Sequence, residues 1–227
     1  MPRESFDREL QRLQDEVLAL GSMVENAITE AVDTLKRRDV EGARRIIAQD
    51  RLINEKRFGI ESKALALIAT QQPAAIDLRT IAAVLDIASE LERIGDYAKG
   101  IARINLMIGR EPLLKPIIDV PAMADKTRDM LYQSLDAFVR RDVELAHAIP
   151  EEDDVVDTLY EQLYRNLIDY IIADQSNIEQ ANYLLWVAHN LERAADRVTN
   201  ICERVIFTVT GKMVELDVKD SSLIGPS

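Results

Sequence analysis

The chain has 227 residues, enough for one large domain or two small ones that need no disulfide or metal to stabilise them. It carries 40 acidic and 28 basic residues, and the net charge of −12 argues against binding to nucleic acid or to an anionic membrane by charge alone. Its single cysteine, Cys202, excludes an intrachain disulfide, and no apolar run reaches the roughly 18 residues of a membrane span. We therefore expect no signal peptide, and a cytoplasmic protein that meets a membrane only indirectly, through partners.

The first half of the chain has the pattern of three long helices. Glycine and proline are few, at 8 and 7, which favours helix throughout. Apolar residues recur every three or four positions from Val84 to Ile108, where Asp77 is placed to cap the helix and Gly109 to end it. Pro73 marks the turn before this helix. We expect the three helices at residues 5–38, 39–70 and 77–109.

The second half of the chain repeats the first. Residues 37–41, Arg-Arg-Asp-Val-Glu, return unchanged at 140–144, a shift of 103. The Leu-Glu-Arg-x-x-Asp motif at 91–96 returns at 191–196, a shift of 100, so the second copy has lost three residues. A repeat of this length indicates a duplicated domain. We predict an all-α protein of two tandem antiparallel three-helix bundles, with a first bundle at residues 1–109, a proline-rich linker at 110–121, a second bundle at 122–212 and a C-terminal tail at 213–227.

Each repeat carries oxygen-bearing side chains four residues apart on its second helix and again on its third. In sequence, the two pairs of a repeat lie symmetrically about the turn between these helices, so an antiparallel hairpin brings them to one level. Carboxylate and amide oxygens are ligands that Mg, Ca, Mn and iron prefer. The sequence therefore predicts a surface metal site in each repeat. The predicted ligands are Asp50, Asn54, Glu92 and Asp96 in the first repeat, and Asp153, Asp157, Glu192, Asp196 and Asn200 in the second.

Two other interpretations remain open at this point. Arg93 can pair with Asp96, as the equivalent residues of the second repeat can, so the carboxylates can also belong to solvated salt bridges on a metal-free helical scaffold. Alternatively, Glu144-x-x-His147 matches half of a ferritin-type di-iron motif, but His189, the other histidine, has no glutamate three residues before it. The sequence shows no glycine-rich phosphate loop and no Ser/His/Asp arrangement, so we expect neither an enzyme nor an organic cofactor.

Several motifs, taken together, are typical of one known family. They occur in both repeats and in the linker, and so cover nearly the whole chain. The motifs are Gln72-Pro73-x-x-x-Asp77-Leu78-Arg79, Ser89-Glu90-Leu91-Glu92-Arg93-Ile94-Gly95-Asp96-Tyr97-Ala98, Glu111-Pro112-Leu113-Leu114-Lys115-Pro116, Asn190-Leu191-Glu192-Arg193-x-x-Asp196-x-x-x-Asn200-Ile201 and Arg204-Val205-Ile206-x-x-x-x-Gly211. With them the chain resembles the PhoU family of phosphate-uptake regulators.

The resemblance implies an all-helical, non-enzymatic protein that represses phosphate transport and signalling. Such proteins are thought to connect the phosphate ABC transporter with a membrane-bound sensor histidine kinase, and the resemblance also implies a homodimer. Some members bind iron or other metal ions through pairs like those above, which implies the same ligands here. The first repeat differs from the second at two of these positions: it has Gly100 where the second has Asn200, and Asn54 where the second has Asp157. We therefore expect the first repeat to bind a metal ion more weakly.

Overall fold

The computed structural model of the chain describes residues 2–114 and 118–216. Every regular element in these residues is helical, which confirms the predicted all-α class. The middle of the expected linker, at 115–117, and most of the expected tail, at 217–227, lie outside the described residues. Within the described part, no helix is both long enough and apolar enough to cross a membrane.

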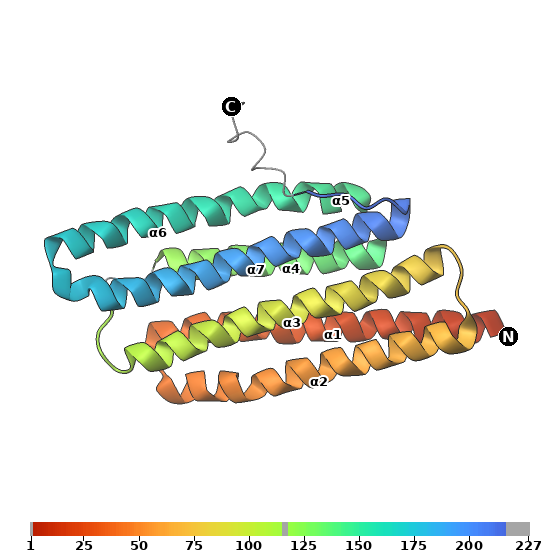
Figure 1. Cartoon of the computed structure of the whole chain (residues 1–227), viewed down its shortest axis with the longest axis horizontal. Helices are drawn as coiled ribbons and strands as arrows, with labels where there is room; N and C mark the ends of the chain where they lie inside the picture. The colour runs from red at the N-terminus through yellow and green to blue at the C-terminus, as the bar shows by residue number, and fades with distance from the viewer. Residues whose placement is uncertain (1, 115–117, 217–227) are drawn as a thin grey trace, which may run out of the picture.

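The first bundle consists of three long helices, α1 (Pro2–Arg37), α2 (Val40–Gln71) and α3 (Ile76–Ile108), close to the expected ranges (Figure 1). Gly109 ends α3, as predicted. The expectation that Asp77 caps α3 is wrong, because the helix begins one residue earlier. Asp77 lies in its first turn and accepts a hydrogen bond of 2.6 Å from Arg3 of α1. Asp77 therefore connects α1 and α3 and does not cap α3.

The second bundle has the same layout, but its middle helix is interrupted. Pro150 lies in a short 3₁₀ turn between α5 and α6, because proline lacks the backbone N–H and clashes with the preceding helical turn. The helix α4 begins at Asp119, inside the expected linker at 110–121. The elements are α4 (Asp119–Arg140), α5 (Val143–Ala148), η1 (Ile149–Glu152), α6 (Asp153–Ala173), η2 (Gln175–Asn177) and α7 (Ile178–Thr210).

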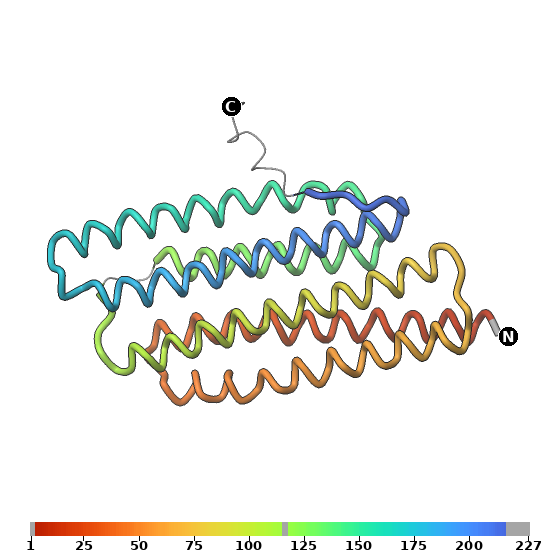
Figure 2. Tube along the Cα trace, in the orientation of Figure 1, coloured from red at the N-terminus to blue at the C-terminus, as the bar shows by residue number. Residues whose placement is uncertain are grey.

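The two bundles lie side by side, an arrangement that the repeat pattern left open. The helix α3 runs antiparallel along α7, and α1 lies beside α4 (Figures 1 and 2). A Cβ atom at Gly21 of α1 would collide with the side chain of Leu135 of α4, so glycine permits this close approach. The equivalent residues Leu91 and Leu191 are fully buried in one apolar core that both bundles share. The duplicated units therefore form a single packed body.

Candidate metal centres

The hairpin of α2 and α3 brings the four predicted residues of the first repeat together, and we call Asp50, Asn54, Glu92 and Asp96 the first cluster. Lys99 lies among them. Its Nζ donates to Asp50 Oδ2 at 2.6 Å and to Asp96 Oδ1 at 3.2 Å, while Asn54 Nδ2 donates to Asp50 Oδ2 at 3.3 Å. Burial raises the pKa of Glu92, and the negative charges of Asp96 and Asp50 raise it further. The cluster is therefore acidic, but it already holds one cation.

Asp50 is the most enclosed member of the first cluster. Only 7% of its surface is exposed, and its Oδ1 atom has no hydrogen-bond partner. Arg57, one turn beyond Asn54, pairs with Glu61 at 2.7 Å, and its charge lowers the pKa of Glu92. Sequence reasoning missed both Lys99 and Arg57 because it compared only the oxygen-bearing positions of the two repeats.

The hairpin of α6 and α7 forms the second cluster, which consists of Asp153, Asp157, Glu192 and Asp196. Burial raises the pKa of Glu192, and the charges of Asp196 and Asp157 raise it further. His189 Nδ1 lies 3.1 Å from Glu192 Oε2, and a protonated His189 would lower the pKa of Glu192. Asp153 is buried in the first turn of α6, where the helix dipole favours a carboxylate. This cluster carries four carboxylates, one of which is the half-buried Glu192.

Asn200, the remaining predicted ligand, takes part in the contact between the bundles. Its Nδ2 donates to Glu90 Oε2 of α3 at 3.2 Å. The equivalent position in the first repeat, Gly100, also faces the other bundle, since a Cβ atom there would lie 2.6 Å from Asn190 Oδ1. The difference between Gly100 and Asn200 therefore reflects the packing of α3 against α7, and the structure places Asn200 on Glu90.

The arginines beside the clusters pair differently in the two repeats. Arg93 pairs with Glu90 at 3.2 Å and not with Asp96, whereas Arg193 Nε forms the expected ion pair with Asp196 Oδ2 at 3.8 Å, a distance too long for a hydrogen bond. The half-motif for di-iron at Glu144 and His147 is exposed on the short helix α5. The structure therefore adds nothing in favour of a ferritin-type site.

The two clusters differ in how well they suit a hard cation. Burial and the like charges of neighbouring carboxylates raise the pKa of Glu192 in the second cluster, as they do for Glu92 in the first, but in the second the donors are all carboxylates. In the first, the ammonium group of Lys99 lies between two of the donors. Among residues 2–114 and 118–216, no three His, Cys, Asp or Glu side chains are already arranged to hold a metal ion. A bound ion would therefore have to draw the side chains of a cluster closer together.

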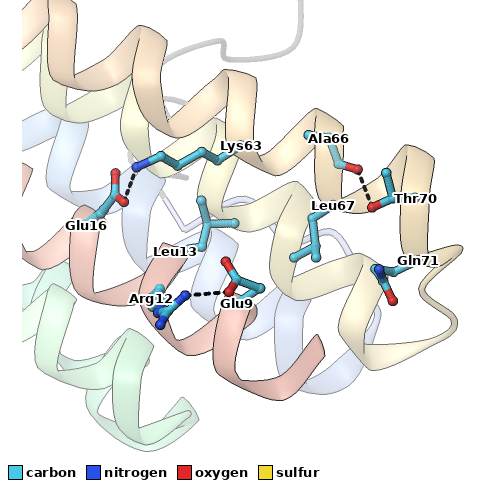
Figure 3. A pocket seen from close by; sticks show the side chains of 9 residues that line it. All are labelled: Glu9, Arg12, Leu13, Glu16, Lys63, Ala66, Leu67, Thr70 and Gln71. Carbon is cyan, nitrogen blue, oxygen red and sulfur yellow. Dashed lines mark hydrogen bonds and ion pairs between the residues drawn. The ribbon is translucent and has the colours of Figure 1, made fainter. Parts of the chain in front are cut away.

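A separate groove of about 460 Å³ runs between α1 and the C-terminal part of α2 (Figure 3). Glu16 of α1 forms ion pairs there with Lys63 and Lys56 of α2. Burial alone would raise the pKa of Glu16, but its hydrogen bond to Lys63 and the charges of both lysines hold the pKa below its ordinary value of 4.5. This contact stabilises the packing of α2 on α1.

We expect the Glu16→Gln change to lower the free energy of unfolding by about 0.5–1 kcal/mol at neutral pH, the usual scale for such pairs. Because folding lowers the pKa of Glu16, the ion pairs stabilise the protein fully above about pH 4.5, the ordinary pKa of the group. This stabilisation is lost as the pH falls through the lower pKa that Glu16 has in the folded state. Urea unfolding of the wild type and of Glu16→Gln, from neutral pH to well below pH 4.5, measures how the difference in their free energies of unfolding depends on pH. A difference that persists unchanged in acid would contradict the assignment.

The chain is similar to known proteins along nearly its whole length. The family model described as PhoU domain matches residues 17–104 and again residues 120–205, so it covers both repeats. The phosphate-specific transport system accessory protein PhoU homolog of Clostridium acetobutylicum is 37% identical and aligns with 96% of this chain and 100% of that protein. The corresponding Escherichia coli protein, PhoU, is 33% identical over 91% of this chain and 86% of its own length.

Solved structures agree with this similarity. The crystal structure of the phosphate transport system regulatory protein PhoU from Streptococcus pneumoniae has a TM-score of 0.86 and 33% identity, and covers 93% of this chain. The crystal structure of PhoU from Pseudomonas aeruginosa has a TM-score of 0.84 and 32% identity, and covers 91%. Each match covers 100% of the crystallised chain. The similarity therefore extends to how the two bundles are placed together.

Proposed function

Because this chain belongs to the PhoU family, we propose that it is a cytoplasmic, non-enzymatic regulator that represses phosphate uptake and the phosphate regulon. The observation that carries the proposal is the full-length match, in both repeats and in fold, to accessory and regulatory proteins of phosphate transport. A shared fold alone would not support a shared function. Here the sequence motifs and the duplicated architecture agree over nearly the whole chain.

The finer role that we propose is that of an adaptor between the phosphate ABC transporter and the sensor histidine kinase. The net charge of −12 opposes direct binding to anionic lipid, which favours membrane contact through protein partners. The outer helices also expose large apolar side chains, including Phe58 and Leu65 on α2 and Ile172 on α6. Such residues suit contacts with other proteins or with a second copy in a homodimer.

We further propose that the hairpin carboxylates bind a hard-ligand cation, such as iron or another divalent metal ion. Support comes from the second cluster, which has four carboxylates, and in which burial and the charges of Asp196 and Asp157 raise the pKa of Glu192. Asp153, Asp157, Glu192 and Asp196 would hold the ion, and it would supply charge neutralisation between α6 and α7. Metal analysis of protein purified without chelator tests this proposal against a metal-free scaffold.

Deletion of the gene tests the regulatory role. We expect phosphate-starvation genes to be expressed constitutively, so that alkaline phosphatase and transporter levels stay high in phosphate-rich medium. Complementation with the wild-type chain should restore repression. Unchanged expression at high phosphate in the deletion strain would contradict the proposal.

Co-purification from phosphate-replete cells tests the adaptor role separately. We expect the transporter ATPase and the sensor kinase to be recovered with the tagged chain. Recovery of neither partner, in a strain in which repression is intact, would contradict the adaptor role while leaving the regulatory role in place.

A further inference from the structure

Lys99 lies between two carboxylates of the first cluster. Its ammonium group bridges Asp50 of α2 and Asp96 of α3, at 2.6 and 3.2 Å, and only 21% of its side chain is exposed. The hydrogen bond to Asp50 is the main reason that the pKa of Lys99 is raised. The lysine therefore lies where a cation shared by the two helices of the hairpin would lie.

The positions of the second repeat that are equivalent to Lys99 and Arg57 carry no charge. The shift of 100 that relates the third helices of the two repeats pairs Lys99 with Thr199, which is buried and uncharged. The shift of 103 that relates the second helices pairs Arg57 with Tyr160. Two cationic positions beside the first cluster are thus neutral positions in the second. The first cluster has three carboxylates beside two cations, whereas the second has four carboxylates and neutral residues at both equivalent positions.

The ammonium group of Lys99 opposes the entry of a metal ion into the first cluster. An ion that enters between Asp50 and Asp96 must break two charge-assisted hydrogen bonds and displace an ammonium group, or remain beside it and be repelled. Asp50 is more than nine-tenths buried and its Oδ1 lacks a partner, so the cluster would still offer a buried oxygen ligand if the lysine were absent.

We infer that Lys99 is the resident cation of the first cluster and keeps metal ions out of it. The inference rests on the proposal that the hairpin carboxylates suit hard-ligand metals, and it assigns that capacity, in the wild-type chain, to the second cluster. The first hairpin is then stabilised by an internal lysine, whereas the proposed metal site lies in the second.

The experiment uses Mn²⁺ alone, an ion that prefers oxygen ligands. The full-length Asp196→Ala protein, in which the second cluster is weakened, serves as the background. Adding Lys99→Thr, which copies the residue of the second repeat, should raise Mn²⁺ binding by one ion per chain in equilibrium dialysis. Adding Lys99→Arg, which keeps the charge, should leave binding unchanged. No gain with Lys99→Thr, or an equal gain with Lys99→Arg, would overturn the inference.

Wild-type crystals soaked in Mn²⁺ provide a second test that needs no variant. We expect no anomalous peak between Asp50 and Asp96, and a peak there would overturn the inference even if Lys99→Thr failed to fold. A missing peak at the second cluster would instead contradict the proposed metal function. The gain of binding with Lys99→Thr would still stand in that case, so the two failures are distinguishable.

Discussion

Replacing Leu191 by alanine is expected to lower the free energy of unfolding by about 2–5 kcal/mol, the range for a buried leucine that leaves a cavity. Leu191 is 0% exposed and lies on α7, where it belongs to the core that both bundles share. Leu91, its equivalent on α3, is also 0% exposed, and the Leu91→Ala change should have a similar cost. Because the core is continuous, each variant should unfold in a single transition at lower denaturant concentration.

Urea unfolding followed by circular dichroism measures both variants. Leu78→Ala on α3 is the matched control, because Leu78 is 43% exposed and its truncation leaves no cavity. We expect the control to stay within about 0.5 kcal/mol of the wild type. Two separate transitions in Leu191→Ala, with the first bundle unaffected, would contradict the single packed body.

The helices could be predicted because local signals and core packing agree along most of the chain. Asp39, for example, precedes α2 and caps it, because its side chain accepts a hydrogen bond of 2.8 Å from the backbone N–H of Gly42. Asp77 was misassigned as a cap because its partner, Arg3, is 74 residues away in the chain, and no local pattern reveals it. The break at Pro150 was overlooked, although proline inside a helical stretch is a local signal of interruption.

The carboxylate clusters could be located because their symmetry about a turn depends only on helix geometry. The turn after α2 contains Pro73, and the turn after α6 lies at residues 174–177, as the spacing requires. The role of Asn200 could not be predicted in the same way, since its contact with Glu90 depends on how the two bundles pack. Lys99 could have been found from sequence, because the shift of 100 makes Thr199 its equivalent in the second repeat, and the difference in charge is visible there.

The second prediction concerns Asp196, which flanks the apolar stripe of α7. Asp196→Ala should empty the second cluster of metal while leaving the fold intact. Attraction of a divalent cation depends on the charge of its ligands, and this change removes one of four carboxylates. Since loss of even a supporting partner around a metal ligand costs about 10–100-fold in affinity, we expect at least a tenfold loss here. The side chain of Asp196 is 28% exposed and carries no core packing, so the metal-free stability should change by less than about 0.5 kcal/mol.

Metal content by mass spectrometry and Mn²⁺-dependent thermal unfolding measure the effect together. In the wild type, Mn²⁺ should raise the unfolding temperature, because a ligand that binds only the folded state stabilises it. This rise should disappear in Asp196→Ala. Asp169→Ala is the matched control, because it removes the same charge from an exposed site on α6 that lies about 18 Å along the helix from Asp157. Equal metal content in the wild type and Asp196→Ala, or unfolding of that variant as from a core substitution, would contradict the second cluster as a metal site.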